Sequence, residues 1–103
     1  MLAAGGCGDD AGSPPPTAVV IDCGLTQPIR SVKSAYAQVR VENPGGDGRV
    51  RVVIRFIADG VGIGRGEATS IALNGGGMTQ VNVVGAEGAT EVDRCEVAEV
   101  ERV

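Results

Sequence analysis

Hydrophobic and polar residues alternate along two segments near the middle of the chain, and both segments predict β-strands. Residues 35–42 (AYAQVRVE) carry small apolar residues at every second position, and residues 49–58 (RVRVVIRFIA) repeat the pattern. A period of two places alternate side chains on opposite faces of a strand, so each segment has one face suited to a core. The many β-branched residues also favour strands. We expect these two strands to form the centre of the fold.

A turn-rich connection, residues 43–48 (NPGGDG), separates the two strands. Pro44 lacks a backbone donor and biases Asn43 to an extended conformation, while the glycines permit positive φ. Neither strand can continue through such a segment. Two topologies stay open at this point. The strands either pair as a hairpin or belong to different sheets, as in an immunoglobulin-like arrangement.

Further apolar or alternating segments predict shorter strands on both sides of this centre. They are residues 18–23 (AVVIDC), 61–66 (VGIGRG), 68–73 (ATSIAL), 78–84 (MTQVNVV) and 95–103 (CEVAEVERV). Asp59-Gly60 is a two-residue hairpin signal after the second central strand. In the last segment a bulge near Ala98-Glu99 would restore one apolar face. A short helix is the alternative there, and its valine content disfavours it.

About seven short strands separated by turns, with no convincing helix, are typical of an antiparallel β-sandwich. We expect residues 18–103 to form this all-β domain. Its predicted core contains Val39, Val41, Val52, Ile54, Phe56, Ile71, Leu73, Val81 and Val83. Residues 1–17 (MLAAGGCGDDAGSPPPT) are small, acidic or proline and show no apolar period. Because they cannot bury enough surface to fold, we expect a disordered N-terminal tether.

The composition excludes several chemistries. The 103 residues contain no histidine and no tryptophan, and Tyr36 and Phe56 are the only aromatic residues. Without imidazole, a serine nucleophile activated by histidine is excluded. The formal net charge of −4 disfavours nucleic acid as a partner, and so few aromatic rings give no platform for stacking bases or sugars. We expect no enzymatic activity and no cofactor.

Two further patterns in the sequence could suggest a binding site, and neither supports one. Glycines at positions 60, 62, 64 and 66 do not form a phosphate-binding loop, because their spacing fails and no helix follows. Acidic residues crowd the end of the chain, at Glu91, Asp93, Glu96, Glu99 and Glu101. No calcium-loop motif is legible among them, so we interpret them as solvated charge and expect no metal site.

Four arginines occupy outward positions of the central strands: Arg40, Arg49, Arg51 and Arg55. They form a possible binding face for an anionic ligand or an acidic partner. The alternative is ordinary solvated charge, since exposed charged residues on strands are common.

The segment Leu2 to Cys7 (LAAGGC) resembles a bacterial lipobox. In that signal, small residues precede a cysteine that is lipidated and becomes the mature N-terminus. The acidic and small residues after Cys7 are similar to a lipoprotein tether. Only six residues precede Cys7, without basic or apolar signal regions, so lipidation requires a start further upstream. The alternative is a flexible tail with an incidental cysteine.

If Cys7 carries a lipid, Cys23 and Cys95 remain as an even pair. Outside the cytoplasm such a pair normally forms a disulfide. A bridge between the first and last strands would close a loop of about 70 residues and contribute roughly 4 kcal/mol by loop entropy. The alternative is two buried free thiols that behave as small hydrophobic side chains.

The order of these features resembles the FxLYD-type immunoglobulin-like domains of bacterial envelope proteins. The matching residues are Tyr36 to Asn43, Val50 to Phe56, Asp59-Gly60, Ile63 to Gly66, Leu73, Cys95 to Val97, Val100 and Arg102. Ala58 stands where the name-giving motif has leucine, and that motif's tyrosine is missing before Asp59. The resemblance covers roughly residues 18–103. It implies a small extracytoplasmic immunoglobulin-like β-sandwich, often behind a lipoprotein signal, without catalytic residues.

The functional hypothesis is therefore a non-catalytic, lipid-anchored envelope domain that acts as an interaction or spacer module. Its expected partner is an envelope protein or a cell-wall component, and its expected contact with the membrane is the lipid on Cys7. The alternative is a soluble anion- or ion-binding β domain that uses the face of Arg40, Arg49, Arg51 and Arg55. A cytoplasmic β domain is the third hypothesis.

Overall fold

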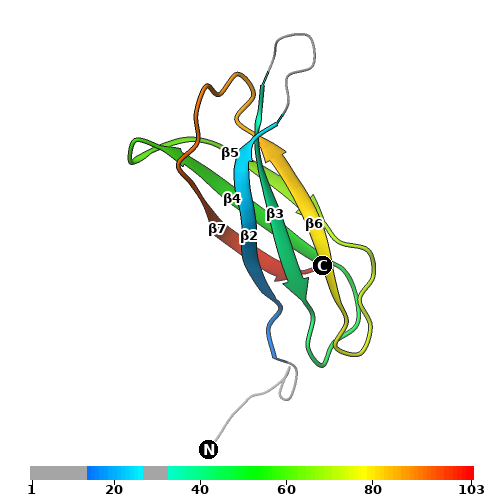
Figure 1. The fold of residues 1–103 in the computed structure, drawn as a ribbon. Helices are drawn as coiled ribbons and strands as arrows, with labels where there is room; N and C mark the ends of the chain where they lie inside the picture. The colour runs from blue at the N-terminus through cyan, green and yellow to red at the C-terminus, as the bar shows by residue number, and fades with distance from the viewer. Residues whose placement is uncertain (1–13, 27–32) are drawn as a thin grey trace, which may run out of the picture.

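The computed structural model describes residues 14–26 and 33–103, and every regular element among them is a β-strand. Six strands follow one another: β2 Thr17–Leu25, β3 Ala35–Glu42, β4 Val50–Ala58, β5 Val61–Thr69, β6 Met78–Gly85 and β7 Arg94–Arg102. They form two antiparallel three-stranded sheets with the orders β2-β3-β6 and β5-β4-β7. The sheets lie one over the other and their strands cross at an angle (Figure 1). The fold is all-β, as predicted, and the arrangement is consistent with a β-sandwich.

The two central strands of the sequence lie in different sheets, so residues 43–48 cross between the sheets instead of closing a hairpin. β3 pairs with β2 and β6, and β4 pairs with β5 and β7. The crossing segment is held by a second connection, residues 70–77. The Gly75 N–H donates to the Gly46 carbonyl at 2.9 Å, and the Leu73 N–H donates to the Gly48 carbonyl at 2.7 Å. These bonds satisfy carbonyls of the crossing segment, which lies outside both sheets.

The core lies between the two sheets, where the inward-facing residues of β3 and β4 meet. Its fully buried members include Ala35, Ala37, Val39 and Val41 on β3, and Val50, Val52, Ile54 and Phe56 on β4. Leu73 and Val83 complete the buried cluster, and Val81 packs against it half-buried. Seven of the nine predicted core residues are therefore buried, and Val81 is half-buried. Ile71 is 69% exposed, so the prediction that it is buried is wrong.

Ile71 is exposed because it lies beyond the end of strand β5. The sequence predicts two strands here, at residues 61–66 and 68–73. β5 instead runs unbroken to Thr69, and the next strand begins only at Met78. At Ser70 the N–H donates to the Val50 carbonyl at 2.8 Å, and the hydroxyl accepts from the Val50 N–H at 3.0 Å. The chain leaves the sheet after this point, so strand alternation no longer decides which side chains are buried. The merger leaves six strands in the described ranges, where about seven were expected.

Two local predictions are confirmed. Asp59 and Gly60 have φ values of 52° and 77°, and they close the β4–β5 hairpin between the paired residues Ala58 and Val61. Val53 pairs with Glu99 and the next residue of β4 pairs with Val97, so Ala98 is the extra residue of a bulge in β7. Because of the bulge, Val97 before it and Val100 after it both face the core.

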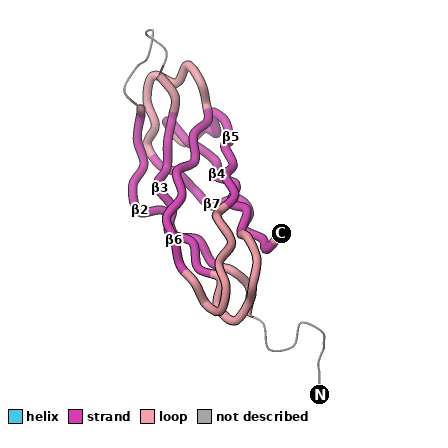
Figure 2. The backbone as a smooth tube through the Cα atoms, turned by 90° about the vertical axis from the view of Figure 1, so that its right-hand side faces the viewer, coloured by secondary structure: helices cyan, strands magenta, loops and turns pink. Residues whose placement is uncertain are grey.

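The two sheets come close together where β5 faces β6. A Cβ atom at Gly66 would collide with the Val84 carbonyl oxygen, and one at Gly85 would collide with the Arg65 carbonyl oxygen. Glycine permits this approach because it carries no side chain. The view turned by 90° shows the connecting loops gathered at the two ends of the strands (Figure 2). The edge strands β5 and β6 therefore pack against each other, and the connecting loops lie at the ends of the strands.

Candidate functional site

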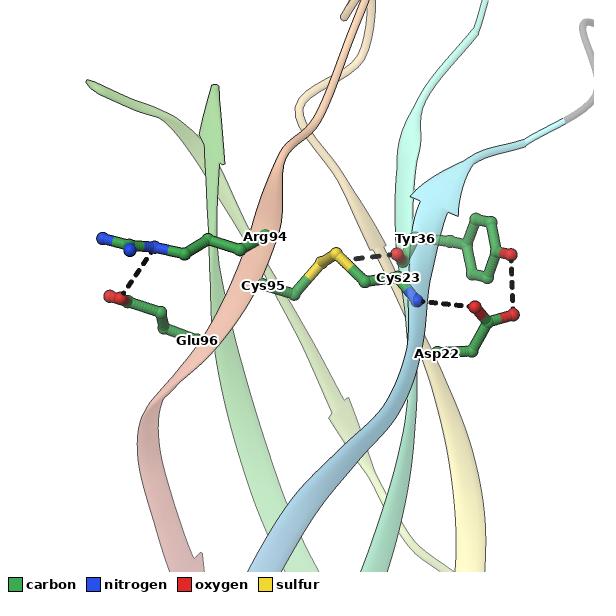
Figure 3. The surroundings of a disulfide bond; sticks show 6 residues. All are labelled: Asp22, Cys23, Tyr36, Arg94, Cys95 and Glu96. Atoms are coloured by element: carbon green, nitrogen blue, oxygen red, sulfur yellow. Dashed lines mark hydrogen bonds and ion pairs between the residues drawn. A yellow bond between two sulfur atoms is a disulfide. The ribbon is translucent and has the colours of Figure 1, made fainter. Parts of the chain in front are cut away.

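A disulfide joins the sheets at the edge opposite to β5 and β6. Cys23 of β2 and Cys95 of β7 are bonded at 2.07 Å, with their Cα atoms 6.0 Å apart (Figure 3). This separation lies within the range of about 4.4–6.8 Å that a disulfide needs. The predicted pairing of the first and last strands is confirmed. The predicted lipidation site, Cys7, lies outside the described residues.

Polar contacts surround the disulfide on the β2 side. The Tyr36 hydroxyl donates to Asp22 Oδ2 at 2.9 Å, and Asp22 Oδ1 accepts from the Cys23 N–H at 2.9 Å (Figure 3). The hydrogen bond to Asp22, together with desolvation and the negative charge of Asp22, raises the pKa of Tyr36 above its ordinary value of 10.0. Gly24 leaves room for the ring, since a Cβ atom there would lie 3.3 Å from Tyr36. These contacts hold the end of β2 in place next to the disulfide.

The four arginines of the predicted binding face are divided between the two sheets. Arg40 lies on β3, Arg51 and Arg55 lie on β4, and Arg49 directly precedes β4. Because the core lies between the sheets, outward side chains of β3 and β4 point to opposite sides of the molecule. Arg40 is therefore separated from the β4 arginines, and the four do not make one continuous surface.

Carboxylates already surround Arg51 on the outer face of its sheet. Its Nε donates to Glu67 Oε2 at 2.8 Å, and its Nη1 lies 3.0 Å from Glu101 Oε1 and 3.5 Å from Glu99 Oε1. The hydrogen bond with Glu67 raises the pKa of Arg51 further and lowers the pKa of Glu67 below 4.5. The register explains the cluster, because Glu101 lies directly opposite Arg51 and Glu67 and Glu99 lie opposite Val53.

A second set of ion pairs lies further along the same face. Arg55 Nη2 is 3.4 Å from Glu96 Oε1, and Arg94 Nε is 3.2 Å from Glu96 Oε2. An anionic ligand at Arg51 or Arg55 would have to displace these carboxylates and would be repelled by them. Each exposed pair adds little to stability. The face is thus a poor anion site, and three of the acidic residues interpreted as solvated charge are arginine partners: Glu96, Glu99 and Glu101.

A group of acidic residues that the sequence analysis did not bring together lies at the end of the β4–β5 hairpin. The carboxylate oxygens of Asp59, Glu91 and Asp93 all lie within 4.8 Å of one another, and all three residues are exposed. The Asp59 N–H donates to Asp93 Oδ2, and the Asp93 N–H donates to the Ile57 carbonyl at 2.7 Å. Asp59 is 34 residues from Asp93, so no local spacing could have revealed the group. Exposed acidic groups of this kind are common without a metal ion, so their proximity alone does not indicate a calcium site.

An open depression of about 490 Å³ lies beside this group, between the β4–β5 hairpin and the loop that joins β6 to β7. It is lined by Ala58, Asp59, Val61, Ile63, Ala86, Glu87, Gly88, Ala89, Thr90 and Glu91. A smaller depression of about 310 Å³ lies over Val53, among the charged side chains of Arg51, Arg65, Glu67 and Glu99. The first combines exposed aliphatic side chains with acidic ones, and the second is bounded by both signs of charge. The hairpin depression is the larger of the two and exposes Val61 and Ile63, so it is the better candidate for binding another molecule.

Within the described ranges, residues 14–26 and 33–103, no helix is long and hydrophobic enough to cross a lipid bilayer. Comparison of the chain with protein-family models, with curated proteins and with solved structures found no match.

Proposed function

We propose that the chain is a non-catalytic interaction or spacer module of the bacterial cell envelope, anchored by a lipid on Cys7. The observation that carries this proposal is the Cys23–Cys95 disulfide, which fastens the two sheets together. Disulfides form and persist in oxidising compartments and are rare in the cytoplasm. A structural bridge across a small β domain therefore favours an extracytoplasmic location over the cytoplasmic hypothesis.

The sequence around Cys7 supplies the anchor in this proposal. It resembles a lipobox and is followed by a tether of small and acidic residues. The immunoglobulin-like type of fold is part of the same proposal. It is supported by the placement of β3 and β4 in different sheets, which such an arrangement requires. The chain also lacks histidine, the commonest general base, which favours a binding or spacing role over catalysis.

Metabolic labelling with a clickable fatty acid tests the anchor. The gene, with its upstream region, is expressed in a bacterial host, and we expect label on the protein and recovery of the protein in the membrane fraction. Cys7→Ser should abolish both. Ser13→Ala, a change of similar size in the same segment, should leave both unchanged. Equal labelling of the Cys7→Ser variant would overturn the proposal.

The redox part of the proposal is tested separately on protein recovered from the same cells. Blocking free thiols before and after reduction, followed by mass spectrometry, should show Cys23 and Cys95 protected until reductant is added. Free alkylation of both thiols in the freshly isolated protein would contradict an oxidising location and favour the cytoplasmic hypothesis.

A further inference from the structure

The end of the fold that carries the β4–β5 hairpin has a surface unlike the charged outer face of its sheet. The depression of about 490 Å³ there has walls of small aliphatic side chains, from Ala58, Val61, Ile63, Ala86 and Ala89. Val61 is 61% exposed and Ile63 is 37% exposed. Two neighbouring exposed aliphatic side chains within a depression offer apolar contact area to another molecule.

The charge of the rim indicates which molecule fits. Each charged side chain that lines the depression is acidic: Asp59, Glu87 and Glu91. Asp93 adds a fourth carboxylate next to Asp59, and Arg94, which follows it, is paired with Glu96. Exposed aliphatic side chains bordered by carboxylates are complementary to an aliphatic side chain flanked by positive charges.

The position of the depression relative to the tether also supports a docking role. At the other end of the molecule, Arg102 Nη2 donates to the Pro14 carbonyl at 2.7 Å, and Arg102 Nε donates to Asn43 Oδ1 at 2.7 Å. These bonds hold the chain before β2 against the end of β7. The hairpin and the loop before β7 lie at the opposite end of the strands (Figures 1 and 2). A domain held by its N-terminal segment would therefore present the depression outward.

We propose that this depression binds a basic peptide segment of another envelope protein, with an aliphatic side chain over Val61 and Ile63. Lysine or arginine side chains of that segment lie against Asp59, Glu87 and Glu91. The inference rests on the proposed function, because it names the chemistry of the partner that such an interaction module binds. It takes the module to be an interaction domain and not a spacer alone.

The test uses the oxidised, folded full chain and a short synthetic peptide with a central leucine between two pairs of lysines, blocked at both ends. We expect saturable changes in amide NMR shifts at residues 58–63 and 86–93 at or below about 1 mM peptide, since the contact area is small. Val61→Ser should weaken binding about tenfold through lost apolar contact. Glu87→Gln with Glu91→Gln should weaken it about two- to fivefold and reduce its salt dependence.

Matched controls separate the site from general attraction between a basic peptide and an acidic protein. Ile71→Ser removes an equally exposed aliphatic side chain at the tether end and should leave binding unchanged. The same peptide with glutamate in place of lysine should not bind. A thermal melt of each variant checks that these surface changes leave the fold intact.

Three outcomes would overturn the inference. The first is that the peptide causes no saturable amide shifts. The second is that the amide shifts spread over the whole surface and persist in Val61→Ser. The third is that calcium shifts the amides of residues 58–63 and 86–93 and the peptide does not. Each leaves the labelling of Cys7 unaffected, so an anchored spacer would remain. Conversely, peptide binding without labelling at Cys7 would reject the anchor and leave the docking site in place.

Discussion

Phe56 shows how much one residue contributes to a core built from small side chains. It is the only phenylalanine and the largest of the fully buried side chains. Phe56→Ala should lower the free energy of unfolding by about 3–5 kcal/mol because it leaves a cavity. That loss is a large part of the roughly 5–15 kcal/mol typical of a whole domain. Urea denaturation measures it, with Ile71→Ala as an exposed control expected within about 0.5 kcal/mol of the parent. Equal losses in the two variants would contradict the assigned core.

Tyr36 offers a spectroscopic test at the same scale. Its hydroxyl is a donor to Asp22 only while protonated, so the folded state favours the neutral form and raises the pKa above 10.0. The hydrogen bond from Tyr36 to Asp22 therefore stabilises the fold fully below the pKa that Tyr36 has in the unfolded chain. This stabilisation is lost as the pH rises through the pKa of Tyr36 in the folded protein. Tyrosinate absorbance should titrate at higher pH in the folded protein than in urea, and Asp22→Asn should lower the folded midpoint. Tyr36 is the only tyrosine, so one group gives the signal. A folded midpoint at or below that in urea would exclude the contact.

At the scale of single residues, the sequence predicted burial wherever strand alternation operates. Val39, Val41, Ile54 and Phe56 are buried as expected because they lie on regular strands with one inward face. Ile71 was missed because it follows Ser70, where the chain leaves the sheet. The grouping of Asp59 with Glu91 and Asp93 was not predictable, because it depends on how the hairpin meets a distant loop.

Among the elements, β5 and β6 depend on two glycines for their close approach. Gly66→Ala or Gly85→Ala should destabilise the fold by about 1–3 kcal/mol, because the added methyl group meets a backbone carbonyl that has little freedom to move. Gly62→Ala is the matched control in the same strand. Its Cβ atom would lie 3.8 Å from the Arg55 side chain, an ordinary contact, so we expect no loss of stability. Thermal melts of the three variants distinguish these cases, and equal melting temperatures would show that the sheets can separate freely here.

The boundaries of the elements were predictable where turn residues mark them and not elsewhere. Asp59-Gly60 ends β4, and the extra residue at Ala98 follows from the broken apolar pattern of the last strand. β5 was divided wrongly at residue 67, because it runs unbroken from Val61 to Thr69, and Gly66 within it allows close packing against β6. The choice between a hairpin and a crossing at residues 43–48 depends on bonds to residues 70–77, which local sequence does not encode.

For the whole molecule, the disulfide closes a loop with a sequence separation of 72. Restricting the unfolded chain in this way should stabilise the domain by about 4 kcal/mol. Cys23→Ser with Cys95→Ser, or reduction of the parent, should therefore lower the stability measured in urea by a comparable amount. Reductant should have no further effect on the double variant. If complete reduction left the stability of the parent protein in urea unchanged, the contacts between the sheets would account for its stability without the disulfide.

The position of the Cys23–Cys95 bond near the two ends of the folded chain also determines how the domain responds to mechanical load. A pull between the tether and the C-terminus travels through the start of β2, the disulfide and β7, and bypasses the closed loop. Only residues 17–23 and 95–103 can be drawn out, an extension of about 50–60 Å at full stretch. Reduction would release roughly 250 Å more. The oxidised domain can therefore lengthen by only a fraction of what the reduced domain would release under the same load.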